Sequence, residues 1–280
     1  MEQQRYIVAV SGGVDSMVLL DVMAQRYTAS HLVVAHFDHG IRPDSQRDAE
    51  CVREAAKRYD IAFEMRREEL GERASEALAR DRRYAFLREL AEKYQATIVT
   101  AHHLDDLVET IAINLTRGTG WRGLAVLDSD VERPLIDKEK SELITYAKTH
   151  RIAWREDATN HTEKYLRNRL RRRFLALNAN DRAEIKREIQ SLHAQQVALK
   201  HEIEAEVVRL IGGGPSYSRY FFTQLPPTVA LECLRAVTHG MLTRPQLQRA
   251  LHAIKVAKSG AVCEVGNGIT IHFSTRHFSL

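Results

Sequence analysis

The sequence predicts an α/β protein: a doubly wound parallel sheet, then a long connecting helix, then a small basic α+β domain at the C-terminal end. Two observations carry this prediction. Short apolar runs alternate with helical patterns over the first 150 residues, and a long polar helical pattern follows and stops at a glycine-rich stretch. Parallel strands covered on both faces appear in sequence as short, nearly continuous apolar runs. The composition, 44% apolar and 28% charged, is typical of a folded globular protein.

Four apolar runs are the expected strands, and three amphipathic stretches between them are the expected helices. The strands are residues 6–10, 32–37, 61–65 and 97–101, and the helices are residues 16–26, 45–59 and 74–94. In a sheet of this kind, ligands bind at the carboxyl ends of the strands. The loops that begin at Ser11, Asp38 and Ala101 should therefore converge on one site.

The second half of the chain predicts three further parts. Another amphipathic helix is expected at residues 138–150, and a polar helix at 181–211 ends at Gly212 to Pro215. A strand, two helices (226–239 and 243–257) and a hairpin turning at 266–268 should follow. We expect a first domain at 1–180, a helical connector and hinge at 181–215, and a small domain at 216–280.

Composition also limits the class of protein. The N-terminus has too short an apolar run for a signal peptide, and no stretch is long enough to span a bilayer, so we expect a cytoplasmic protein without membrane contact. Cys51, Cys233 and Cys263 form no C-x-x-C pair, so neither zinc nor an iron–sulfur cluster is expected.

The strongest motif is SGGVDS at residues 11–16, between the first strand and the first helix. Glycines at such a turn let backbone N–H groups approach an anion, and the helix N-terminus adds partial positive charge. Phosphate is the natural occupant, although the loop lacks the lysine of a Walker A motif. Asp15 suits a magnesium contact or a helix cap. The predicted nucleotide contacts in this loop are Ser11, Gly12, Gly13, Val14, Asp15 and Ser16.

Two more motifs follow strand ends. In AHFDHGIR (residues 35–42), His36, Asp38 and Arg42 stand where they would contact a nucleotide, and a buried structural His–Asp pair is the alternative. In TAHHLDDLVET (residues 100–110), Asp105, Asp106 and Glu109 gather on one side of a helix start. Such a cluster would hold a cation or accept a proton from an amine, or it would simply complement the helix dipole.

Two basic segments complete the motifs. The glycine-rich loop at residues 117–123 carries Arg117 and Arg122, which would stabilise negative charge unless the loop is only a surface turn. The run KYLRNRLRRRFL at residues 164–175 has six basic residues and no acid. Arginines interleaved with aromatic rings suit RNA, and a solvated helix face is the alternative. The predicted RNA contacts are Arg122, Tyr165, Arg167, Arg169, Arg171, Arg172 and Arg173.

The SGGVDS loop resembles the pyrophosphate loop of enzymes that split ATP between its α and β phosphates. Together with residues 35–42, 77–87, 100–110, 117–124 and 133–136 in this order, it is similar to the tRNA(Ile)-lysidine synthetase family. That resemblance implies an adenine nucleotide alpha hydrolase-like fold and ATP and magnesium as cofactors. It makes residues 1–180 the catalytic domain and 216–280 a tRNA-binding domain.

The resemblance also implies a reaction. ATP would adenylylate the wobble cytidine of tRNA(Ile) with a CAU anticodon, and the ε-amine of free lysine would displace AMP to form lysidine. Asp15, Asp38, Asp105, Asp106, Glu109 and Arg117 would be catalytic, and Asp105, Asp106 and Glu109 would bind lysine. The sequence leaves open whether the protein forms a homodimer, and whether it is a naturally short form or part of a longer chain.

Three rival interpretations remain. A tRNA thiolase would need cysteines to carry sulfur, and an amidotransferase ligase would bring a glutaminase domain with a nucleophilic cysteine. A nucleotide-regulated RNA-binding protein would have little use for acids beside a triphosphate. Release of pyrophosphate in the presence of tRNA separates the enzymes from the binding protein.

Overall fold

The computed structural model describes residues 4–40, 45–71, 75–155, 166–212 and 214–280, and the side chains within these ranges except those of residues 76 and 166–168. The chain divides into two compact units, residues 1–197 and 198–280. Helix α7 (Ala179–Ile211) contributes to both.

The first unit is built on a four-stranded parallel sheet with the order β3-β2-β1-β4. Ile7 of β1 lies between Val33 of β2 and Ile98 of β4. The strand order reverses beside β1, which makes the crevice between the carboxyl ends of β1 and β4 the expected ligand site. The strands are β1 (Arg5–Ala9), β2 (Leu32–Asp38), β3 (Ala62–Arg67) and β4 (Ala96–Val99). The predicted fold class is confirmed.

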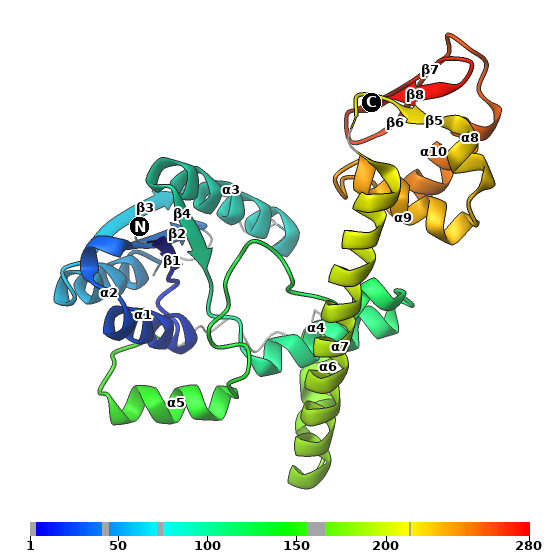
Figure 1. Cartoon of the computed structure of the whole chain (residues 1–280). Helices are drawn as coiled ribbons and strands as arrows, with labels where there is room; N and C mark the ends of the chain where they lie inside the picture. The colour runs from blue at the N-terminus through cyan, green and yellow to red at the C-terminus, as the bar shows by residue number, and fades with distance from the viewer. Residues whose placement is uncertain (1–3, 41–44, 72–74, 156–165, 213) are drawn as a thin grey trace. The chain divides into compact units, whose positions relative to one another are not determined.

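Helices cover both faces of this sheet (Figure 1). Because side chains alternate along a strand, Tyr6 and Val8 pack into the core with α1 and α2, whereas Ile7 packs on the opposite face with α3. Helix α5 extends the first core by packing Leu143 and Ala147 against it. These helices are α1 (Val14–Arg26), α2 (Ser45–Arg58), α3 (Glu76–Tyr94) and α5 (Lys140–Thr149), with a 3-10 turn η1 at Ala29–His31.

A separate cluster holds the rest of the first unit together. Helix α4 (Leu104–Thr116) buries Leu104, Leu107, Val108 and Ile111, the i, i+3, i+4, i+7 spacing of one helix face. Phe174 of α6 (Leu166–Leu175) and Ile189 of α7 pack against this face. The 3-10 turn η2 (Trp121–Gly123) follows α4. The acidic start of α4 and the basic helix α6 are therefore neighbours.

The second unit has its own core beneath an antiparallel sheet with the order β5-β8-β7-β6. The predicted helices and hairpin are present, and Asn267 at the turn has a φ of 53°. The elements are β5 (Tyr217–Ser218), α8 (Arg219–Gln224), α9 (Pro227–Val237), α10 (Arg244–Val256), β6 (Val262–Gly266), β7 (Ile269–Phe273) and β8 (His277–Ser279). Among the described residues, no helix is both long and apolar enough to cross a membrane.

Candidate active site

The loop at residues 11–16 is shaped by its own side chains. The Ser16 hydroxyl accepts from the Ser11 backbone N–H at 3.1 Å and donates to the Gly13 carbonyl at 2.9 Å. Gly12 has a φ of 95°, which favours glycine. Gly13 is the N-cap of α1, and none of the described side chains caps that helix start. Backbone N–H groups at the start of α1 are therefore available to an anion.

Two residues outside the loop, Asp48 and Arg155, help to hold it in place. The Arg155 N–H donates to the Gly12 carbonyl at 3.0 Å, and the Arg155 guanidinium pairs with Asp48. A Cβ on Gly12 would come within 3.5 Å of the Asp48 side chain. The loop is fixed by α2 and by the segment after α5, not by its own sequence alone.

The ammonium of Lys140 lies on the carboxylate of Asp15. Its Nζ is 2.7 Å from Oδ1 and 2.6 Å from Oδ2, although the two residues are 125 positions apart. The Lys140 backbone N–H donates to Asp105 Oδ2 at 2.8 Å. Lys140 thus joins the glycine-rich loop to the acidic start of α4.

His103, the N-cap of α4, lies among three carboxylates. Its Nε2 is 3.7 Å from Asp15 and 3.5 Å from Asp106, and its Nδ1 is 3.7 Å from Asp105. Asp106 also accepts from the His103 backbone N–H at 3.2 Å. The structure therefore brings together three predicted site residues, Asp15, Asp105 and Asp106, around an imidazole.

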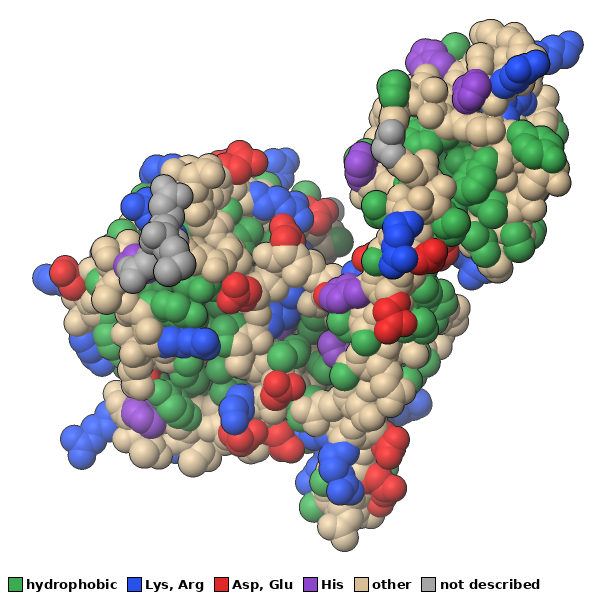
Figure 2. Space-filling view, in the orientation of Figure 1, with side chains coloured by type: hydrophobic (Ala, Val, Ile, Leu, Met, Phe, Trp, Pro, Cys, Tyr) green, Lys and Arg blue, Asp and Glu red, His purple; other side chains and the backbone are tan. Residues whose placement is uncertain are grey.

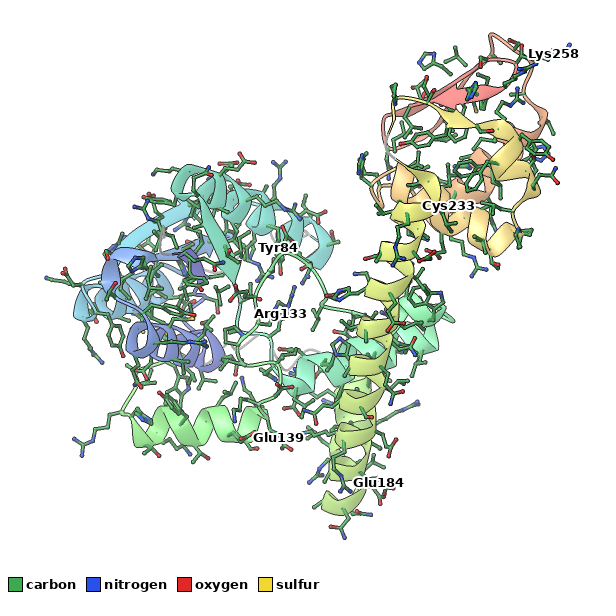
Figure 3. All side chains as sticks on the ribbon, in the orientation of Figure 1. Tyr84, Arg133, Glu139, Glu184, Cys233 and Lys258 are labelled. Atoms are coloured by element: carbon green, nitrogen blue, oxygen red, sulfur yellow. The ribbon has the colours of Figure 1, made fainter. Side chains whose placement is uncertain are left out.

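A buried lysine of α7 completes this cluster. Lys186 Nζ lies 2.8 Å from Asp105 and 2.9 Å from Glu139, which begins α5 and is labelled in Figure 3. Burial opposes the charge of Lys186, but its hydrogen bonds to these two carboxylates raise its pKa above the ordinary value. Burial likewise raises the pKa of Asp105, yet the bonds from Lys186 and Lys140 outweigh this effect and hold that pKa below its usual range. The negative charge of Asp105 is therefore already balanced by the ammonium of Lys186.

Glu109 is engaged by the basic helix. Its carboxylate is buried on α4 and pairs with Arg171 Nε of α6 at 2.5 Å. A predicted lysine-binding acid and a predicted RNA-binding arginine thus contact each other. Asp105 and Glu109 thus each pair with a basic side chain from another helix.

The strand-end residues of β2 are deeply buried. His36 donates from Nδ1 to the Val10 carbonyl at 2.8 Å, and burial lowers the pKa of His36 below its ordinary value. Asp38 accepts from the Gly40 N–H and the Ser45 hydroxyl, and Arg67 lies 3.5 Å away. In these contacts His36 and Asp38 bond to other partners and not to each other, and those of Asp38 organise the loop after β2. Arg42 lies outside the described residues.

The remaining predicted residues fall into two groups. Arg117 is exposed at the end of α4, and Arg122 stacks on the neighbouring Trp121 ring at 4.6 Å. Arg169, Arg172 and Arg173 are exposed on α6, where Arg167 has no described side chain and Tyr165 lies outside the described residues. Acidic and basic side chains are interspersed on the face of the first unit that Figure 2 shows. The arginines of α6 are a local concentration of positive charge.

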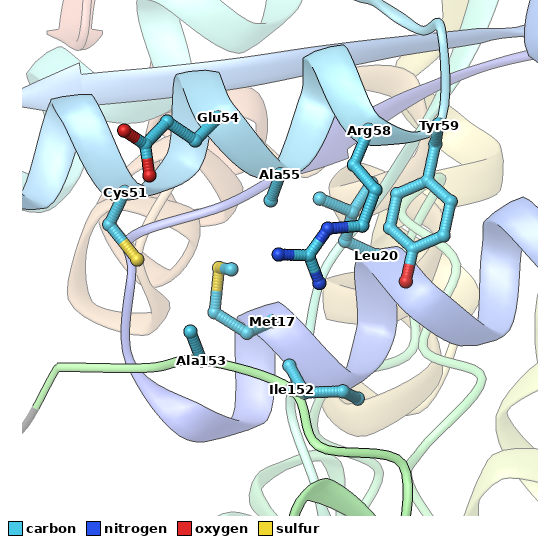
Figure 4. A pocket seen from close by; sticks show the side chains of 9 residues that line it. All are labelled: Met17, Leu20, Cys51, Glu54, Ala55, Arg58, Tyr59, Ile152 and Ala153. Atoms are coloured by element: carbon cyan, nitrogen blue, oxygen red, sulfur yellow. The ribbon is translucent and has the colours of Figure 1, made fainter.

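A pocket lies between α1 and α2, and one of its lining residues, Met17, directly follows Ser16 of the loop (Figure 4). Met17, Leu20 and Ile152 give it an apolar wall, and Arg58 and Glu54 add charge. None of the predicted site residues lines it. We therefore assign the nucleotide to the loop and not to this pocket.

His102 should make the unfolding free energy of the protein depend on pH. Burial lowers its pKa from 6.5 to about 4, and its Nδ1 lies 2.8 Å from the Thr100 hydroxyl. Because the folded state disfavours the proton, this residue stabilises the fold fully above pH 6.5 and less as the pH falls towards 4. From pH 7 to pH 5, wild-type protein should lose about 2 kcal/mol of unfolding free energy through this residue.

Urea unfolding at the two pH values measures this loss. His102→Asn should show a pH dependence smaller by that amount, while the contribution of His36 stays in both proteins. Equal pH dependence in the two proteins would contradict a His102 that is held neutral in the folded state.

A parallel α/β sheet with an anion-binding loop at its switch point, faced by acidic groups, defines a nucleotide-binding protein of the pyrophosphate-loop class. The chain belongs to the PP-loop domain family, whose model matches residues 1–178.

Relatives and solved structures agree with this class. The chain is 42% identical over 187 residues to a tRNA(Ile)-lysidine synthase of Exiguobacterium sibiricum. This alignment covers 64% of this chain and 44% of that protein. It is 34% identical over 251 residues to the tRNA(Ile)-lysidine synthase of Enterococcus faecalis, covering 79% and 54%. The chain thus spans about half the length of these relatives. The U34-tRNA thiolase NcsA of Methanococcus maripaludis shares the fold, with a TM-score of 0.59 at 14% identity over 70% of this chain and 73% of that one.

Three residues of the site are absent from the sequence-based prediction of site residues: His103, Lys140 and Lys186. His103 belongs to a motif that the sequence did reveal, but its position among three acids depends on the fold. Lys140 and Lys186 lie in amphipathic helices whose lysines look like ordinary solvated residues. No local pattern distinguishes them, because their partners are far away in the sequence.

Proposed function

We propose that this chain carries the activity of a tRNA(Ile)-lysidine synthase. ATP adenylylates the position-2 carbonyl oxygen of the wobble cytidine in tRNA(Ile) with a CAU anticodon, and pyrophosphate leaves. The ε-amine of free lysine then attacks carbon 2, and AMP departs with that oxygen. The observation that carries the proposal is the meeting of the glycine-rich loop with the acidic start of α4 through Asp15, His103 and Asp106.

The nucleotide binds at the loop in this proposal. Backbone N–H groups of residues 11–16 hold the phosphates, and burial at the end of β2 lowers the pKa of His36 and so disfavours its charged form. Among the described residues, no group of three or more His, Cys, Asp or Glu side chains is arranged so that it could hold a metal ion by itself. In this proposal Asp15 would be one ligand of a magnesium ion that enters with ATP and takes most of its other ligands from phosphate and water. Such an ion would neutralise phosphate charge.

The amine binds beside the acids of α4. Lysine is a cation, and the carboxylates of Asp105, Asp106 and Glu109, which stand on the first turns of α4 beside the loop, would favour its binding there. A carboxylate in this position orients the ammonium group and takes its proton as the nitrogen attacks. Glu109 would become available to the amine once Arg171 is drawn to RNA.

The tRNA binds along α6 in this proposal, which gives a salt-dependent prediction. The double variant Arg172→Ala, Arg173→Ala should weaken tRNA binding and reduce the slope of log affinity against log salt by about 1 to 2, because each arginine that contacts a phosphate releases a counterion. Filter binding over a salt series measures both quantities. The double variant Lys148→Ala, Arg151→Ala removes the same charge from exposed positions near the end of α5 and should change neither. Equal slopes in all three proteins would make α6 a solvated face.

Incorporation of radiolabelled lysine into unmodified CAU-anticodon tRNA(Ile) tests the function itself. Label should appear only with ATP and magnesium and disappear when the wobble cytidine is replaced by uridine. Release of pyrophosphate without label would retain the ATP chemistry and overturn lysine as the nucleophile. No release of pyrophosphate and no label would overturn the proposal for this chain.

A further inference from the structure

The PP loop itself contains no lysine, but the fold places the side chain of Lys140 beside it. Lys140 places its ammonium 2.6 to 2.7 Å from both carboxylate oxygens of Asp15, the acidic residue of the loop. Its side chain is 41% exposed, and that of Asp15 is 27% exposed. The ammonium is therefore accessible to a ligand that arrives from solvent.

The position of Lys140 is fixed by its surroundings. Its backbone N–H donates to Asp105, and the carbonyl of Lys138 accepts from the Leu104 N–H at 2.9 Å. Leu143 and Ala147, farther along α5, are buried in the core shared with α1. Lys140 and Asp15 therefore lie on two helices, α5 and α1, that pack against each other. The packing of these helices places the side chain of Lys140 beside the loop.

Stability gives little reason for such a contact. A partly exposed ion pair contributes about 0 to 1 kcal/mol because water and salt screen it. A polyphosphate on the loop presents more negative charge than a single carboxylate, at a point where the start of α1 already favours anions. The ammonium would then turn from Asp15 to the phosphate oxygens, which accept charge-assisted hydrogen bonds.

We propose that Lys140 binds the pyrophosphate portion of ATP and neutralises it as it leaves. This inference rests on the proposed function and adds to it a binding residue from outside the loop. In the adenylylation step the bond between the α phosphorus and the α–β bridging oxygen breaks, and its electron pair goes to pyrophosphate. Lys140 stays protonated and balances the charge that pyrophosphate gains, while the α phosphorus bonds to the cytidine oxygen.

Binding of inorganic pyrophosphate with magnesium, measured by calorimetry, tests the proposal without tRNA or lysine. Lys140→Met should weaken binding by about 10- to 100-fold, the effect of losing a hydrogen bond to a charged group. Lys140→Arg should restore most of the affinity because it keeps the charge. Lys138→Met is the matched control: Lys138 lies two residues away, is 56% exposed and pairs with Glu142 at 3.8 Å, so its loss should leave pyrophosphate binding unchanged.

Wild-type affinity in Lys140→Met would overturn the proposal and leave Lys140 as a structural tie to Asp15. An affinity of Lys140→Arg as low as that of Lys140→Met would also overturn the proposal. If the positive charge of Lys140 binds the phosphates, the positive charge of an arginine should largely replace it. Should Lys140→Met fail to fold, Lys140→Gln tests the same loss of charge. Because no lysine or tRNA is present, a failure of the lysidine proposal leaves these results unaffected, and the lysine-incorporation assay on wild-type protein identifies that failure separately.

Discussion

Asp15→Asn should lower the rate of pyrophosphate release from ATP by about 100- to 1,000-fold, the usual effect of removing one preorganised charge from a reacting centre. The substitution keeps the shape of the side chain but removes the negative charge that faces Lys140 and His103. Affinity for tRNA should stay nearly unchanged, because the predicted RNA contacts lie on α6 and in the loop after α4.

Steady-state pyrophosphate release and tRNA binding, measured on the same preparation, test this expectation. Asp60→Asn makes the same chemical change at an exposed turn, where a φ of 56° is compatible with Asn, and should retain the wild-type rate. Turnover of Asp15→Asn at the wild-type rate would remove Asp15 from the catalytic set.

Lys186→Met should reduce the unfolding free energy by about 2 to 3 kcal/mol, somewhat less than the usual cost of breaking a fully buried ion pair because its partners are partly exposed. The ammonium is enclosed between Asp105 and Glu139, and its loss leaves two neighbouring carboxylates that repel each other. The pKa of Asp105 should rise as well, since the bond from Lys186 is a main cause of its low value.

Urea unfolding at pH 7 measures the loss of stability. Arg187→Met, at the adjacent exposed position of α7, is the control and should change the free energy by less than about 0.5 kcal/mol. A loss of that small size in Lys186→Met would mean that water, and not the ion pair, balances Asp105.

The fold was predictable because its signals are local. Each strand of the parallel sheet is a short apolar run, and each covering helix shows its own periodicity, so the sequence defined these elements without knowledge of their neighbours. The glycine-rich loop was equally recognisable, since the residues that shape it, from Ser11 to Ser16, are adjacent. The extra elements α8 and β8 of the second unit were missed because they are only six and three residues long.

The partners of the acids were not predictable. Asp105, Asp106 and Glu109 are visible as a cluster, but nothing near them in the sequence indicates that Lys186 takes the first and Arg171 the third. Asp38 illustrates the same difficulty, because its position after a strand suits catalysis and loop organisation equally well. Only the contacts with Gly40 and Ser45 favour the second.

The contact between Asp15 and Lys140 spans 125 positions of the chain. A contact of such high sequence separation forms only after the intervening strands and helices have been ordered, so the folding chain should acquire a complete phosphate site late. Local opening of α5 would remove one wall of that site while leaving the sheet intact. Nucleotide that binds only when α5 is folded in place should stabilise α5 against local opening. It should therefore slow hydrogen exchange in α5 more than in the central strands.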